Sequence, residues 1–97
     1  MSALFWNNHQ RRVGPGFSIG DVKNGVADVL RQLRFTDIRH TELEVAGNRD
    51  GCVLSVGHFR SGERDFWEVT ICGGSDGAIT QRTRDEVVKK LIDMRFL

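Results

Sequence analysis

The stretch from Ile38 to Ile71, IRHTELEVAGNRDGCVLSVGHFRSGERDFWEVTI, decides the fold that we expect. Side chains alternate between two faces in three runs, at residues 40–45, 53–57 and 66–71. A period of two in runs rich in β-branched and aromatic residues is typical of half-buried strands. The segments 47–51 and 61–64 between the runs contain the Gly, Asn, Asp and Ser residues that tight turns need. The stretch therefore predicts a three-stranded antiparallel meander.

A register for this meander follows from requiring one apolar face. We pair Val45 with Cys52, Leu43 with Leu54, Thr41 with Val56, Val56 with Val69, Leu54 with Ile71, and His58 with Trp67. Cys52 and Cys72 then lie on opposite faces, so we expect free thiols. Slipping the second hairpin by one residue would set the two cysteines opposite each other but would scatter the apolar face.

A helix is expected on each side of the meander in sequence. The first begins near Ser18, with Asp21 three residues later, and its apolar face is Ile19, Val22, Val26, Val29, Leu30 and Leu33. The last begins at the stronger capping box of Thr83 and Glu86, and its stripe is Val87, Val88, Leu91, Ile92 and Phe96. Residues 78–81 are either a fourth strand or a helical lead-in.

The fold class that these elements predict is α+β. We expect an α-β-β-β-α two-layer sandwich with an antiparallel sheet of three strands, or four if residues 78–81 add one, and both helices on one face. Residues 18–97 form this single domain, and residues 1–17 form an irregular N-terminal extension.

Composition is ordinary for a globular chain, with 97 residues, 39% hydrophobic residues and a net charge of +1. Near-neutrality removes the usual electrostatic indication of nucleic-acid binding. Two cysteines are too few for a disulfide framework, and no apolar run is long enough to span a membrane. The N-terminus lacks a secretory apolar region, which favours a cytoplasmic location and no membrane partner.

No catalytic, cofactor-binding or metal-ligating residue stands out, and we do not expect an enzyme. His9, His40 and His58 lack metal-ligand spacing and are expected on the surface or at a sheet edge. The cysteines are expected to be structural. The glycine-rich segments 14–20 and 73–77 lack the lysine of a phosphate-binding loop, so we interpret them as turns and caps.

The expected order of elements over residues 18–97 is similar to that of double-stranded RNA-binding domains. That family has a Gly-Pro-x-His-type loop between its first two strands and a Lys-Lys-x-Ala-Lys run opening its last helix. Here the first loop is Gly47-Asn48-Arg49-Asp50-Gly51 and the helix opens with Thr83-Arg84-Asp85-Glu86, whose acids oppose phosphate contact. The resemblance is one of topology, and no functional residue is carried across.

The face of the sheet away from the helices is the candidate functional surface. The helices are expected to cover the side that carries Leu43, Leu54 and Val69. The reverse side is too apolar to stand alone in water, so something should cover it. The expected interaction residues are Leu4, Phe5, Trp6, Val53, Phe59 and Phe66. The favoured function is a small non-catalytic interaction domain that forms homo-oligomers or binds another protein.

Two alternatives belong to other functional classes. One is nucleic-acid binding through Arg11, Arg12, Arg49, Arg82 and Arg84. The other is an accessory subunit or a small enzyme, which would require a cleft holding His58 and Glu68.

Overall fold

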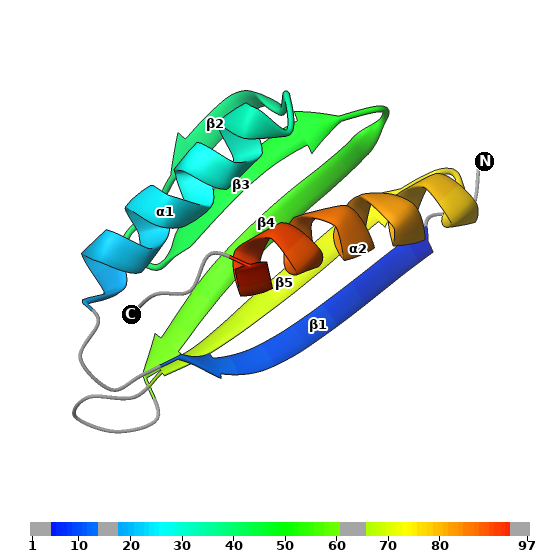
Figure 1. Cartoon of the computed structure of the whole chain (residues 1–97). Coiled ribbons are helices and arrows are strands. Elements are labelled where there is room, and N and C mark those ends of the chain that lie inside the picture. The colour runs from blue at the N-terminus through cyan, green and yellow to red at the C-terminus, as the bar shows by residue number, and fades with distance from the viewer. Residues whose placement is uncertain (1–4, 14–17, 61–65, 94–97) are drawn as a thin grey trace.

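A computed structural model shows an open five-stranded antiparallel sheet with two helices on one of its faces (Figure 1). It describes residues 5–13, 18–60 and 66–93, and the side chains from residue 8 onward. The elements are β1 (Phe5–Val13), α1 (Ile19–Gln32), β2 (Thr36–His40), β3 (Glu44–Arg49), β4 (Cys52–Arg60), β5 (Phe66–Gly74) and α2 (Gly77–Asp93). The α+β class and the antiparallel meander are therefore confirmed, with more strands than expected.

Strand β1 replaces the irregular extension that we expected at the N-terminus. It pairs antiparallel with β5, from Phe5 opposite Gly74 to Val13 opposite Phe66, and the sheet order is β1-β5-β4-β3-β2. Helix α1 then carries the chain from this edge of the sheet to the other edge, where β2 lies (Figure 1). The element order is β-α-β-β-β-β-α, so the topological similarity to double-stranded RNA-binding domains is not maintained.

The first predicted strand is broken by a turn, and the first predicted loop is mostly strand. Residues 41–43 connect β2 to β3, and Thr41 donates its backbone N–H to the Glu44 carbonyl at 2.9 Å. Asp50 and Gly51 alone connect β3 to β4, with φ of 52° and 75°. Two positive φ angles are those of a type I′ hairpin turn, which favours Asp-Gly. Val45 consequently lies opposite Val56, and Cys52 opposite Arg49.

The second hairpin is shifted by one residue from the predicted register. Leu54 lies opposite Cys72, Val56 opposite Thr70, and His58 opposite Glu68. A shift of one residue turns every side chain of β5 to the other face. The helix-covered face therefore receives Phe66, Glu68, Thr70 and Cys72, which are all buried, while Trp67 and Ile71 are exposed on the reverse.

The first helix follows the prediction at its start. Ser18 caps it by accepting a hydrogen bond from the Asp21 N–H at 3.0 Å, and Val22, Val26, Val29 and Leu30 are buried. Phe35, which we expected to close the core, is also buried.

The last helix begins six residues before the predicted capping box. Asp76 caps it by accepting from the Ile79 N–H at 3.0 Å, so residues 78–81 are helical and Thr83 is a buried interior residue. Val87, Val88 and Leu91 are buried as predicted, but Ile92 is 51% exposed. Phe96 lies outside the described residues.

Candidate interaction surface and buried polar cluster

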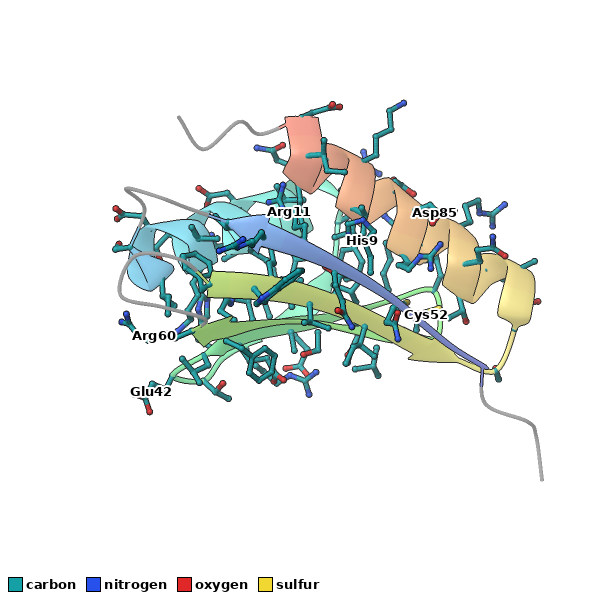
Figure 2. All side chains as sticks on the ribbon, turned by 90° about the horizontal axis from the view of Figure 1, so that it is seen from below. His9, Arg11, Glu42, Cys52, Arg60 and Asp85 are labelled. Atoms are coloured by element: carbon teal, nitrogen blue, oxygen red, sulfur yellow. The ribbon has the colours of Figure 1, made fainter. Side chains whose placement is uncertain are left out.

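The face of the sheet opposite the helices carries an exposed apolar centre on β4 and β5. Its four large residues are Val53, Phe59, Trp67 and Ile71, exposed by 48%, 54%, 40% and 39%. In Figure 2 both helices lie above the sheet and a layer of side chains projects below it. This apolar centre is contiguous, because Phe59 lies opposite Trp67, the half-buried Val69 lies between Trp67 and Ile71 along β5, and Val53 is diagonal to Ile71 on the neighbouring strand.

Polar residues border this centre on both sides. Arg12 lies opposite Trp67, Gln10 opposite Val69 and Asn8 opposite Ile71, so β1 supplies one polar border. On the other side, Glu44 and Asn48 of β3 lie opposite Gly57 and Val53. Arg39 of β2 donates to Asn48 Oδ1 at 3.3 Å and extends this second border. An apolar centre inside a polar rim is the usual anatomy of a protein–protein interface.

Only part of the predicted interaction set lies on this surface. Val53 and Phe59 are exposed there. Phe66 is a correction, because it is 3% exposed on the helix-covered face and packs edge-on against His58. Phe5 and Trp6 belong to β1, with Trp6 opposite Gly73, while their side chains and Leu4 lie outside the described part of the chain.

Trp67 and Ile71 are the members of the surface that sequence reasoning placed inside. In β5 the set of Trp67, Val69 and Ile71 is more apolar than Phe66, Glu68, Thr70 and Cys72, so periodicity favoured burying the wrong set. The contacts that bury the Glu68 side of β5 instead are not visible in the local sequence, because the partners of Glu68 come from β1 and β4.

The helix-covered face contains a buried polar cluster of Arg11, His58 and Glu68. Glu68 accepts from Arg11 Nε at 2.6 Å, and its other carboxylate oxygen lies 3.4 Å from His58 Nε2. His58 Nδ1 lies 2.9 Å from the Leu43 carbonyl oxygen, and since a carbonyl only accepts, Nδ1 carries a proton. Glu68 and His58 are 1% and 0% exposed, which corrects the expectation that His58 lies at the surface.

The electrostatics of this cluster keep Glu68 ionised. Burial alone would raise the pKa of its carboxyl, but the contacts with His58 and Arg11 outweigh burial and the pKa is lowered from its usual 4.5. His58 and Glu68 are thus adjacent, yet they lie inside the core rather than in a cleft. The cluster fits a role in holding β1, β4 and β5 together, since each strand contributes one member.

The arginines proposed for nucleic-acid binding are dispersed. Arg11 faces the core, Arg12 lies on the rim of the open sheet face, and Arg84 on α2 donates to Asp85 and to the Asn8 carbonyl. Only Arg49 and Arg82 come together, in a pocket between the end of α1, the β3–β4 turn and α2. No continuous basic stripe joins the five.

The two thiols are free and buried, as predicted, but they share the helix-covered face. Cys52 Sγ lies 3.7 Å from Thr80 Oγ1. Burial, reinforced by the neighbouring Cys52, raises the pKa of Cys72 to about 12, which opposes any nucleophilic role. Within the described residues, no group of three or more His, Cys, Asp or Glu side chains is placed to hold a metal ion.

The described part of the chain contains no helix that is both long and apolar enough to cross a membrane. No protein-family model matches the chain, and no curated protein matches it in sequence. Function is therefore inferred from the surface itself.

Proposed function

We propose that this protein is a small non-catalytic interaction domain that self-associates through the open face of its sheet. The observation that carries the proposal is the contiguous exposed patch of Val53, Phe59, Trp67 and Ile71. A residue such as Trp67 is seldom left this exposed beside three other large apolar side chains unless another surface covers them. The cytoplasm is the compartment we propose, which suits two reduced thiols.

A second copy is the occupant that the surface fits best. A twofold axis running along the strands between β4 and β5 would place the apolar centre of one copy on that of the other. The same axis would bring the β1 edge with Arg12 over the β3 edge with Glu44 of the other copy, which places one pair of opposite charges across the rim. Face-to-face packing of two sheets about 10 Å apart is a common architecture.

The size of the face also suits a dimer. The five strands have nine, five, six, nine and nine residues. At about 4.8 Å between strands and about 3.3 Å per residue they cover roughly 600 Å², at the lower end of the ~600–1,000 Å² per partner that specific interfaces bury. The four exposed side chains contribute roughly 350 Å² of apolar surface per copy, if a large side chain exposes about 150–250 Å² when free. Two copies would therefore remove about 700 Å² of apolar surface from water.

The test combines solution mass with matched charge insertions. Val53→Glu and Ile71→Glu place a carboxylate in the apolar centre, and each should convert the dimer to a monomer over the micromolar range. Ile92→Glu is the matched control, because Ile92 is an exposed apolar residue on α2, on the other side of the molecule. Phe66 is unsuitable for this test because it is buried. A wild-type protein that remains monomeric at high concentration would refute the proposal.

A further inference from the structure

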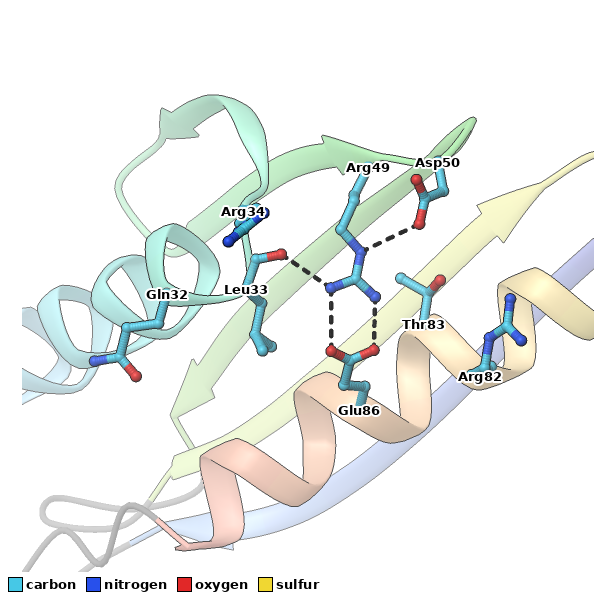
Figure 3. Close-up of a pocket in the computed structure, with 8 residues that line it drawn as sticks. All are labelled: Gln32, Leu33, Arg34, Arg49, Asp50, Arg82, Thr83 and Glu86. Atoms are coloured by element: carbon cyan, nitrogen blue, oxygen red, sulfur yellow. Dashed lines mark hydrogen bonds and ion pairs between the residues drawn. The ribbon is translucent and has the colours of Figure 1, made fainter.

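A polar pocket with a volume of about 470 Å³ lies on the helix side of the molecule, away from the open sheet face (Figure 3). Its walls are the C-terminal end of α1, the Asp50-Gly51 turn and the middle of α2. The residues lining it are Gln32, Leu33, Arg34, Arg49, Asp50, Arg82, Thr83 and Glu86. The volume is that of a site for a small molecule rather than for a monatomic ion.

Arg49 forms the rigid floor of this pocket. Its two terminal nitrogens lie 3.3 and 2.8 Å from the two carboxylate oxygens of Glu86, and one of them also donates to the Leu33 carbonyl at 3.0 Å. Its guanidinium lies 4.9 Å from the centre of the Phe35 ring. The second acid of the pocket, Asp50, lies 3.7 Å from Arg49 Nε. Arg49 therefore forms ion pairs with both acids of the pocket, Asp50 and Glu86. A fork-to-fork pair of this kind fixes how the two side chains lie relative to each other.

Arg34 and Arg82 are the two remaining cations of the pocket. Figure 3 shows them on opposite sides of the Arg49–Glu86 pair, Arg34 beside the end of α1 and Arg82 on α2. Among the residues that the structure describes, neither guanidinium has a carboxylate partner, because both acids of the pocket contact Arg49. Three arginines and two carboxylates give the pocket a net charge of +1. Because both carboxylates contact Arg49, the positive charge that a ligand would meet is that of Arg34 and Arg82.

Arg34 also occupies a backbone position that a non-glycine residue rarely takes. The Arg34 N–H donates to the Arg31 carbonyl and the Phe35 N–H to the Leu30 carbonyl, which together form a Schellman cap at the end of α1. The residue at this position of the cap is usually glycine, because its φ is positive, and Arg34 has a φ of 64°. An arginine at a position that favours glycine costs the fold some stability.

We propose that this pocket binds a small anion with two oxyanion groups, phosphate or carboxylate, held by Arg34 at one end and Arg82 at the other. Guanidinium groups recognise both kinds of oxyanion through paired hydrogen bonds. The exposed Gln32 amide on the same wall adds a neutral hydrogen-bonding group. The site is independent of self-association through the sheet.

The test is calorimetric titration of the full chain with pyrophosphate and, separately, with succinate, at low ionic strength. Arg82→Ala should weaken binding by about tenfold or more, the loss expected for a charge-assisted contact. Lys89→Ala is the matched control, because it removes one exposed positive charge from α2 outside the pocket, and it should change affinity by less than about twofold. Preference for pyrophosphate or for succinate identifies the oxyanion.

Arg34→Gly separates binding from folding. Glycine suits the cap, so this variant should unfold at a higher temperature than the wild type while its anion affinity falls by about tenfold or more. Absence of binding to both anions at about 10 mM would overturn the proposal, as would equal weakening by Lys89→Ala. A short nucleic-acid duplex that binds more tightly than either anion and needs Arg82 would also overturn it, in favour of a nucleic-acid site.

Discussion

Replacing Glu68 with glutamine is the sharpest perturbation of the core. Glu68→Gln preserves the shape of the side chain but removes the negative charge that lies 2.6 Å from Arg11 Nε and 3.4 Å from His58 Nε2. Removing one partner of a buried ion pair destabilises a protein by about 3–5 kcal/mol, because the other charge stays buried without compensation. We expect about 3 kcal/mol, at the lower end, because the Gln oxygen still accepts from Arg11, whose side chain is 20% exposed.

The effect should depend on pH in a defined direction. The pKa of Glu68 is lowered in the folded state, so the folded protein favours the ionised carboxylate. The stabilisation is therefore fully present above the unfolded-state value of 4.5 and is lost as the pH falls through the lower folded-state pKa. Glutamine does not titrate, so the difference in stability between the wild type and Glu68→Gln should be largest near neutral pH and should shrink in acid.

Urea unfolding followed by tryptophan fluorescence, at one protein concentration and at several pH values below neutrality, measures this difference. Near neutral pH the variant should also melt about 12–24 °C lower, at ~4–8 °C per kcal/mol for a chain of this size. Asp28→Asn is the matched control, because Asp28 is 62% exposed in its pair with Arg31 and should contribute less than about 1 kcal/mol. A Glu68→Gln effect no larger than that of the control, or a difference that stays constant into acid, would refute the reasoning.

Three further predictions concern glycines, a cap and the thiols. Gly74→Ala should destabilise the protein by about 1–3 kcal/mol, because the new Cβ would lie 2.8 Å from Thr80 Oγ1 and 3.0 Å from Cys52 Sγ. Gly20→Ala, whose new Cβ would have its nearest neighbouring atom at 3.9 Å, should instead stabilise α1 by about 0.5–1 kcal/mol, and thermal melting distinguishes the two signs. Ser18→Ala should lower the free energy of unfolding by about 1 kcal/mol through loss of the hydrogen bond from the Asp21 N–H, which urea titration measures, and Ser18→Asp, which keeps an acceptor, should restore it. Cys72, with its pKa raised to about 12, should resist alkylation by iodoacetamide at pH 8 until urea unfolds the chain; labelling of the folded protein at the rate of the unfolded one would contradict its burial.

The parts of the fold that sequence predicted are those with strong local patterns. The face of α1 repeats at steps of three and four, and its Ser18 cap lies where the sequence placed it. The parts that failed depend on partners far away in the chain. Strand β1 has no alternating pattern in FWNNHQRRV, and it becomes a strand because β5 offers it an edge.

The two register errors have different physical origins. In the first hairpin the Asp50-Gly51 dipeptide was a usable signal, because a two-residue type I′ turn is a strong hairpin indicator and it fixes where β3 and β4 pair. In the second hairpin, Glu68 is buried only because Arg11 and His58 meet it in three dimensions. The sequence therefore predicted an open apolar sheet face, and Val53 and Phe59 are exposed on it. Phe66, which was also expected there, is buried, whereas Trp67 and Ile71, which were expected inside, are exposed.

The mass of the protein in solution, measured by analytical ultracentrifugation across a micromolar concentration series, tests the proposed self-association most directly. We expect a reversible dimer of twice 11.0 kDa for the wild type and for Ile92→Glu, and a monomer for Ile71→Glu. A monomeric wild type throughout the series, or a dimer that Ile71→Glu leaves intact, would contradict the assignment of the open sheet face as the surface that joins two copies.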